Sequence, residues 1–176
     1  MVRLSTLLQA IEVLESWNDS DIEISKLAYH SANVSEGDVF VCIKGYETDG
    51  HRYVDQALAN GAAAIVVEDY QDTCNLPQYR VVNTRQALAA MADVYYNHPS
   101  QTLKMIGITA TNGKTTTAFM TNGILEAHGY NTGLIGTVMV KYGGYSEPSI
   151  LTTPESLDLQ HHFARMVNSN VTHTIM

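Results

Sequence analysis

A run of small and polar residues in the second half of the chain has the composition of a phosphate-binding loop. Residues 107–116 read GITATNGKTT, after an apolar stretch and before a segment with a helical pattern. In that setting, backbone N–H groups and the amino end of the helix attract phosphate oxygens. Gly113 would allow close approach, Lys114 would reach the β- and γ-phosphates, and the Thr115 hydroxyl would bind Mg²⁺. The stretch therefore predicts binding of a nucleoside triphosphate.

The fit to the strict phosphate-loop pattern is incomplete. That pattern has glycine five residues before Gly113, where this chain has Ile108, and Gly107 lies one residue too early. A Gly-Lys-Thr triplet also occurs by chance, so a helix start with a purely structural role stays open as the alternative. The strand–loop–helix context favours the phosphate site.

Strands and helices are predicted to alternate around this loop. Apolar, β-branched runs predict three strands, at 104–109, 132–138 and 171–176. Two helices are predicted, over 114–129 and from 154 to about 168. Thr153 would cap the second helix, with Pro154 as its first residue. Gly143-Gly144, between two β-prone runs, predicts a hairpin.

The first half of the chain shows the same alternation. Strands are predicted at 35–45, 62–69 and 79–82. Helices are predicted over 4–14, 51–61 and 84–97. Ser5 and Thr84 are the expected amino-terminal caps, and Gly61 fits the position just after a helix.

This alternation is typical of α/β domains with a largely parallel sheet. His98-Pro99 must end the preceding helix, so we place a domain boundary near 98–102. We expect an α/β domain over 1–99. The first part of a mainly parallel α/β ATP-binding domain with a phosphate loop would follow over 100–176.

Composition excludes several classes of protein. The chain has 176 residues, 45% of them hydrophobic, and a formal net charge of -8, which indicates a globular protein and disfavours a broad nucleic-acid surface. No apolar stretch approaches the roughly 20 residues of a membrane helix. The first residues do not read as a signal peptide. We expect a cytoplasmic protein with no membrane insertion, no nucleic-acid partner and no obligate protein partner.

Other candidate residues carry weaker signals. Glu47-Thr48-Asp49 follows the first predicted buried strand, where α/β proteins bind ligands, but a solvated acidic loop is an equal alternative. Thr152-Thr153 could be no more than a helix cap. No cluster of cysteine and histidine suggests zinc. A surface or capping role is expected for six scattered histidines, His30, His51, His98, His161, His162 and His173.

Several segments together resemble the Mur ligase family of peptidoglycan enzymes, and within it the type that adds the third amino acid to the UDP-N-acetylmuramoyl-dipeptide. The likeness spans the whole chain, and it implies that the α/β domain over 1–99 is a UDP-precursor-binding domain. It rests on six segments: 37–51, 59–68, 95–100, 107–117, 132–138 and 151–160. The resemblance implies a ligase that uses ATP and Mg²⁺ to convert a substrate carboxylate into an acyl phosphate. The amine of a free amino acid, diaminopimelate or lysine, then attacks and forms an amide.

The resemblance also implies roles for individual residues. Lys114 would stabilise the transferred phosphoryl group and Thr115 would hold Mg²⁺, which makes these two the catalytic candidates. The ATP-binding residues would be Ala110, Thr111, Asn112, Gly113, Lys114, Thr115 and Thr116. The precursor would contact Ser31, Tyr46, Glu47 and Thr48 with its nucleotide part, and Thr152 and Thr153 with its muramoyl part.

Three positions depart from the family pattern. The family's Asp-Ser-Arg reads His30-Ser31-Ala32 here, Ala110 replaces the first glycine of the phosphate loop, and Leu151 stands where asparagine often precedes the threonine pair. If position 110 needs a positive φ, alanine would cost roughly 1 kcal/mol and weaken ATP binding. The departures also leave open a related precursor as substrate.

The last residues, VTHTIM, read as a strand with no turn after it, so we expect a truncated chain. In the family, a metal-binding glutamate follows this strand, and the amino-acid site lies further on. We therefore expect this chain alone to be inactive as a ligase. Two rival interpretations stay open: an unrelated P-loop NTPase, and a non-catalytic module that binds a nucleotide sugar or a protein.

Overall fold

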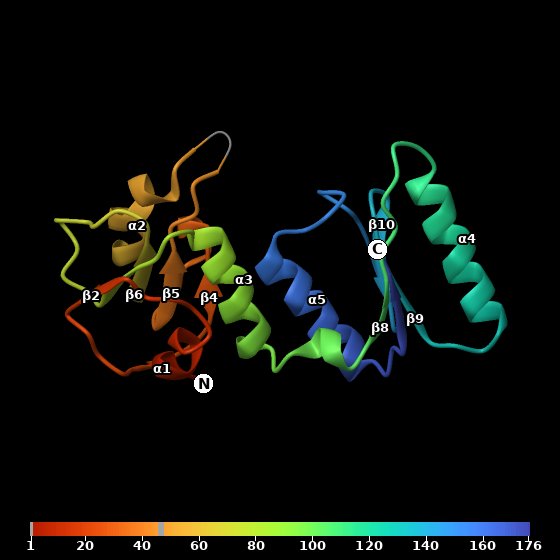
Figure 1. Ribbon diagram of the computed structural model, residues 1–176, viewed down its shortest axis with the longest axis horizontal. Coiled ribbons are helices and arrows are strands. Elements are labelled where there is room, and N and C mark those ends of the chain that lie inside the picture. The colour runs from red at the N-terminus through yellow and green to blue at the C-terminus, as the bar shows by residue number, and fades with distance from the viewer. Residues whose placement is uncertain (1, 46–47) are drawn as a thin grey trace. The chain divides into compact units, whose positions relative to one another are not determined.

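The computed structural model describes residues 2–45 and 48–176 and divides into two compact units, Met1–Tyr95 and Tyr96–Met176 (Figure 1). Each unit is built on a five-stranded sheet flanked by helices. The α/β class with largely parallel sheets, expected from the sequence, is confirmed. The two units are described separately.

In unit 1, the sheet order is β2-β7-β6-β5-β4. The strands are β2 (Glu15–Trp17), β4 (Leu27–Ala28), β5 (Asp38–Val41), β6 (Ala62–Val67) and β7 (Gln78–Arg80). Strands β4 to β7 pair in parallel, and only β2 pairs antiparallel, with β7. Two short strands, β1 (Val2–Arg3) and β3 (Glu23–Ile24), form a separate antiparallel pair.

The central strands of unit 1 are buried on both faces. Phe40 packs with the helix residues Val54 and Ala57 on one face, while Val39 and Val41 have no exposed surface either. Side chains alternate along a strand, so these neighbours point to opposite faces. Burial of both faces explains why β5 and β6 read as continuous apolar runs.

The helical segments of unit 1 are α1 (Leu4–Leu8), η1 (Ser31–Asn33), η2 (Gly50–Tyr53), α2 (Val54–Ala59) and α3 (Thr84–Tyr95). The predicted helix over 4–14 is wrong in length, because Leu14 instead donates its N–H to Arg80 O and leads into β2. Gly61 has φ of +98°, as expected just after a helix.

Both predicted caps in unit 1 are wrong. Ser5 lies inside α1 and its own N–H donates to the Asp21 carboxylate at 3.2 Å. Thr84 is the first residue of α3, and Asn83 Oδ1 accepts the Gln86 N–H at 2.9 Å. Asparagine is as good a capping residue as threonine, so the register of the cap differs by one position.

In unit 2, the sheet order is β11-β10-β9-β12-β8. The strands are β8 (Lys104–Ile106), β9 (Thr132–Ile135), β10 (Met139–Tyr142), β11 (Tyr145–Pro148) and β12 (His173–Ile175). β8, β12 and β9 are parallel, and β10 and β11 extend the sheet as an antiparallel hairpin. The hairpin turn is Gly143-Gly144, as predicted, and both glycines have positive φ.

Unit 2 has the helices η3 (Pro99–Gln101), α4 (Lys114–Ala127) and α5 (Ser156–Asn168). Ala118 of α4 packs with Leu134 and Ile175, whereas Phe163 of α5 packs with Ile135. Leu134 and Ile135 point to opposite faces, so α4 and α5 cover the two sides of the sheet (Figure 1). The predicted Thr153 cap is wrong, because α5 begins at Ser156, whose N–H is accepted by the Glu155 carboxylate.

Candidate functional site

The glycine-lysine-threonine loop of unit 2 lies at the carboxyl edge of the parallel strands. Residues 107–113 connect the end of β8 to the start of α4. The Ile108 N–H donates to Met176 O at 2.7 Å, and the Met176 N–H donates to Ile106 O at 3.0 Å. The loop therefore starts from the end of β8 and is anchored to the end of β12. This edge is where open α/β sheets bind ligands.

The loop turns into α4 through a left-handed residue. Gly113 has φ of +80°, and a Cβ placed there would meet nothing within 4 Å. Its carbonyl accepts the Thr117 N–H at 2.9 Å and begins the helix. Across the described residues, no hydrogen bond is found from the backbone N–H groups of 109–113. A row of such N–H groups at a helix start fits the oxygens of a phosphate.

The side chains predicted to bind phosphate and metal emerge from this turn. Lys114 Nζ donates to Ala110 O at 2.7 Å, so the ammonium lies across the mouth of the loop. Lys114 and Thr115 are half-buried. The other predicted members of the set are exposed: Ala110, Thr111, Asn112, Gly113 and Thr116. An ammonium and exposed hydroxyls beside free N–H groups make a site suited to a polyphosphate with its metal ion.

The alanine at position 110 does not strain the loop. In the described part of the chain, the non-glycine residues with positive φ are Asn18, Asn97, His98 and Asn170. Ala110 is not one of them, so its backbone angle is one that any L-residue adopts. The condition under which alanine would cost roughly 1 kcal/mol is therefore not met here.

The threonine pair lies on the same edge of the same sheet. Thr137 follows the carboxyl end of β9, and its hydroxyl donates to Thr152 Oγ1 at 3.4 Å. Thr152 and Thr153 are exposed, and so is Leu151 beside them. Since β8, β12 and β9 are parallel, unit 2 presents this pair and the phosphate loop along one edge.

In unit 1, two of the four residues predicted to contact the nucleotide part can be located. Ser31 is buried in η1, where its hydroxyl donates to Gln56 Oε1 at 2.8 Å and its carbonyl accepts from Asn60 at 2.9 Å. Thr48 is exposed, with its hydroxyl 3.2 Å from Tyr53 Oη. Tyr46 and Glu47 lie outside the described residues.

A charged network at the carboxyl ends of β5 and β6 was missed by sequence reasoning. Lys44 Nζ lies 2.7 Å from Asp69 Oδ2 and 3.1 Å from Glu68 Oε2. The other oxygen of Glu68 accepts both the N–H and the hydroxyl of Thr84 at 3.0 Å. Asp49 and His51 complete the network at the far end of the loop. Partners up to 25 residues apart gave no local signal in the sequence.

The network keeps its acids ionised. Hydrogen bonding to the Lys44 ammonium lowers the pKa of Asp69 and raises that of Lys44 to about 12. Partial burial opposes ionisation of Glu68, but the Thr84 N–H and Lys44 outweigh it and hold the pKa of Glu68 below its usual value. The surface or capping role expected for His51 is wrong, because this residue is 9% exposed and its ring nitrogens bond to Asp49 and to the N–H at the end of β6.

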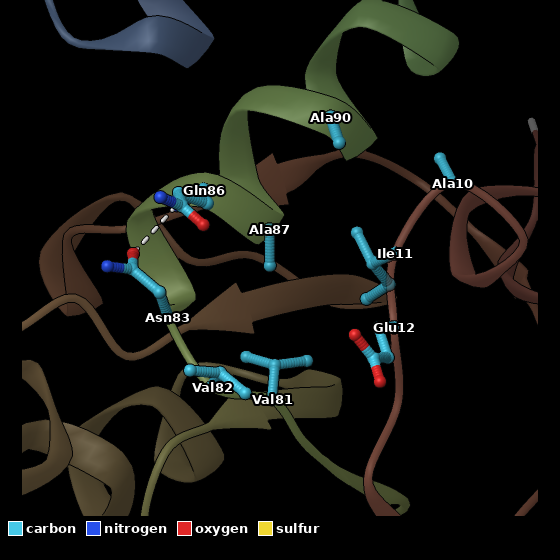
Figure 2. Close-up of a pocket in the computed structure, with 9 residues that line it drawn as sticks. All are labelled: Ala10, Ile11, Glu12, Val81, Val82, Asn83, Gln86, Ala87 and Ala90. Atoms are coloured by element: carbon cyan, nitrogen blue, oxygen red, sulfur yellow. Dashed lines mark hydrogen bonds between the residues drawn. The ribbon is translucent and has the colours of Figure 1, made fainter.

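Cavities occur away from the predicted residues. One of about 240 Å³ in unit 1 lies between the segment after α1, the segment after β7 and the start of α3 (Figure 2). Its lining is largely apolar: Ala10, Ile11, Glu12, Val81, Val82, Asn83, Gln86, Ala87 and Ala90. Figure 2 also shows the hydrogen bond that Asn83 makes with Gln86 at the helix start. None of the predicted site residues lines this cavity.

Among residues 2–45 and 48–176, no group of three or more histidine, cysteine or acidic side chains is arranged to hold a metal ion. None of the helices in these ranges has both the length and the apolar character that a membrane crossing requires.

Two family models match the chain, one after the other. The model described as "Mur ligase family, catalytic domain" matches residues 23–96, and the model described as "Mur ligase middle domain" matches residues 108–176. A similar curated protein is the UDP-N-acetylmuramoyl-L-alanyl-D-glutamate–2,6-diaminopimelate ligase of Clostridium botulinum, 44% identical over 181 residues. The match covers 99% of this chain but only 37% of that ligase.

Solved structures show the same fold. A UDP-N-acetylmuramoyl-L-alanyl-D-glutamate–2,6-diaminopimelate ligase superposes with a TM-score of 0.73 at 21% identity, covering 97% of this chain and 35% of that one. The MurF ligase of Thermotoga maritima in complex with ADP gives a TM-score of 0.58 at 24% identity, covering 86% of this chain and 31% of that one.

Proposed function

Because the chain belongs to the Mur ligase family, we propose that it is the precursor-binding and phosphate-binding part of an ATP-dependent ligase of the MurE type. The ligase would join an amino acid to UDP-N-acetylmuramoyl-L-alanyl-D-glutamate during peptidoglycan synthesis in the cytoplasm. The chain spans 37% of the length of the Clostridium botulinum relative, so ligase activity is proposed only for a protein that also supplies the remaining length. The observation that carries the proposal is the order of the two family matches, with the phosphate loop at the start of the second.

The two predicted domains divide the proposed work. Residues 1–99 would bind the nucleotide part of the precursor through Ser31, Tyr46, Glu47 and Thr48. Residues 100–176 would bind ATP through 110–116 and the muramoyl part through Thr152 and Thr153. The arrangement of unit 2 supports the second assignment, because the threonine pair and the phosphate loop lie along the same carboxyl edge of the sheet.

In the proposed reaction, a substrate carboxylate takes the γ-phosphoryl group of ATP, and an amine then displaces phosphate to form the amide. Lys114 would place its positive charge against the transferred group, where such charge is most effective. The N–H groups of 109–113 would orient the polyphosphate. Thr115 would supply a hydroxyl ligand to Mg²⁺, which neutralises phosphate charge when bound. The amino acid would be diaminopimelate, the substrate in the relative's name, or lysine.

Calorimetry with the 176-residue chain tests the proposal in two titrations, one with UDP-N-acetylmuramoyl-L-alanyl-D-glutamate and one with Mg·ATP. We expect each ligand to bind on its own, and no amide product when an amino acid is added. Binding of ATP alone would contradict the precursor role and favour a different phosphate-loop NTPase. Binding of the precursor alone would contradict the ATP site and favour a non-catalytic module.

A further inference from the structure

The imidazole of His51 joins two segments of unit 1 that are far apart in sequence. On one side, Nδ1 lies 2.6 Å from Asp49 Oδ1, and the same oxygen accepts the His51 backbone N–H at 3.0 Å. On the other side, Nε2 accepts the backbone N–H of Glu68 at 2.9 Å. The ring therefore connects the loop after β5 to the carboxyl end of β6.

The partners of the ring fix its tautomer. A backbone N–H can only donate, so Nε2 must act as an acceptor toward Glu68. The proton of the neutral ring is then on Nδ1 and is donated to the Asp49 carboxylate. Partial burial of Asp49 opposes its ionisation, yet hydrogen bonds from the His51 backbone and ring lower the pKa of Asp49 below its usual value.

The rest of the loop is held at the same place. The Gly50 N–H donates to Ile43 O at 2.9 Å, and the Gly45 N–H donates to Thr48 O at 2.9 Å. The backbone of Lys44 forms an isolated antiparallel β-bridge with that of Asp49, and the Lys44 ammonium donates a hydrogen bond to the Asp69 carboxylate. Backbone pairing and the imidazole thus act directly on residues 48–50, and the Lys44–Asp69 ion pair holds the residue that pairs with Asp49.

We propose that His51 is a positioning residue for precursor binding: by joining Asp49 to the Glu68 N–H, it holds Thr48–Gly50 in the geometry that the uridine diphosphate end requires. This inference rests on the proposed function. Both ring nitrogens are used inside the protein, so His51 acts through the loop and not by touching the ligand. We call the Asp49–His51–Glu68 arrangement the clamp. It holds the exposed Thr48 at the carboxyl edge of parallel strands, where the ligand would bind. A loop ordered in advance loses less entropy on binding.

Three substitutions separate the two functions of the ring. His51→Gln keeps an acceptor near the position of Nε2 and loses the donor to Asp49. His51→Asn keeps a donor near Nδ1 and loses the acceptor for Glu68. His51→Phe keeps the ring volume and loses both, and His128→Phe, at an exposed histidine of unit 2, is the matched control.

The measurement is the dissociation constant of UDP-N-acetylmuramoyl-L-alanyl-D-glutamate by calorimetry. With two hydrogen bonds lost, His51→Phe should weaken binding about tenfold or more, and His51→Gln and His51→Asn should fall between it and the wild type. The proposed site for Mg·ATP lies in unit 2. The dissociation constant for Mg·ATP should therefore change less than twofold in every variant. The control should match the wild type with both ligands.

Two results would overturn the inference while leaving the proposed function intact. One is wild-type affinity for the precursor in a folded His51→Phe variant. The other is a ¹⁵N spectrum of the wild-type ring with the proton on Nε2, a reading that does not depend on any variant folding. Failure of the wild-type chain to bind the precursor would instead contradict the proposed function, and this inference with it.

Discussion

The two loops proposed to bind ligand differ in how many of their polar groups are paired. In unit 1, the described part of the loop after β5 is held by backbone pairs and by side chains: Gly50 donates to Ile43 O, Lys44 pairs with Asp69, and His51 joins Asp49 to the Glu68 backbone. In unit 2, the loop after β8 is anchored by backbone at its ends, through Ile108 and Gly113. Between those ends, the described N–H groups of 109–113 make no hydrogen bond within the chain.

This difference shows where each loop obtains its order. In the described residues of the first loop, backbone and side-chain polar groups pair within the chain, so residues 48–50 are held in place before any ligand arrives. The second exposes N–H donors that water satisfies in the free chain and that phosphate oxygens can take over when a ligand binds. A polyphosphate would therefore order the second loop more than the precursor orders the first.

The glycines of the two loops repeat the contrast. A Cβ on Gly50 would lie 2.8 Å from Ile43 N and 3.0 Å from Cys42 C, so this glycine allows close backbone packing. Gly113 has open space around it but a φ of +80°, so this glycine allows a left-handed turn. Substitution by alanine separates the two requirements.

The largest expected effect is that of Gly50→Ala. The added Cβ meets backbone atoms that cannot rotate away, so unit 1 should lose about 3 kcal/mol of unfolding free energy. Urea unfolding followed by the fluorescence of Trp17, the one tryptophan in the sequence and part of β2, measures this loss in unit 1.

Gly113→Ala is the matched control, in which only the positive φ is strained. We expect unit 2 to lose about 1 kcal/mol of unfolding free energy. Amide hydrogen exchange of α4 measures this loss. Equal losses at the two glycines would contradict the proposed difference between packed and exposed loops.

The next largest effect is expected from Lys114→Met. Removing the ammonium deletes a charge-assisted contact to phosphate, worth about 1.5–3 kcal/mol, so the dissociation constant for Mg·ATP should rise roughly 10- to 100-fold. Lys104→Met removes the same charge from the exposed face of β8 and should leave binding unchanged. An equal loss in both variants would mean that the overall charge of the unit, and not the loop, governs affinity. Calorimetry measures both.

These local requirements differ in how far they could be read from the sequence. The apolar runs of β5 and β6 and the Gly-Lys-Thr turn are encoded by neighbouring residues, so they were predicted. The helix predicted over 4–14 is too long, because residues beyond Leu8 keep a helical pattern while the Leu14 N–H donates to Arg80 O. The clamp around His51 was missed for the same reason, since its partner Glu68 lies 17 residues away.

A smaller effect is expected at the hairpin turn, where the two requirements for glycine occur side by side. Both glycines have positive φ, but a Cβ on Gly143 would lie 2.5 Å from Ser169 Cβ, whereas Gly144 has open space. Gly144→Ala should cost about 1 kcal/mol from backbone strain alone, and Gly143→Ala should cost more. The double variant Gly143→Ala/Ser169→Gly should return to the cost of Gly144→Ala, as measured by thermal unfolding. If it does not, the contact with Ser169 is not the source of the difference.

The smallest expected effect is a difference in acid sensitivity between the units. In unit 2, burial lowers the pKa of His162 below its ordinary 6.5, although Glu147, 3.9 Å away, and Asp158 act against the shift. Arg165 and His161 add to the lowering, and the Tyr142 hydroxyl faces Nδ1.

Because the folded pKa of His162 is lowered, the unfolded chain binds more protons than the folded chain once the pH falls below about 6.5. The stabilising contribution of the neutral ring is therefore complete above that pH and is lost as the pH falls through the folded value. In unit 1, Lys44 lowers the pKa of Asp69 below 3.8, so the contribution of that carboxylate is lost only at more acid pH. Between pH 7 and 5, the protection factors of the α5 amides, which correct for the intrinsic pH dependence of exchange, should therefore fall in the wild type and less so in His162→Phe. An identical pH dependence in the two proteins would show that another group in unit 2 takes up the proton.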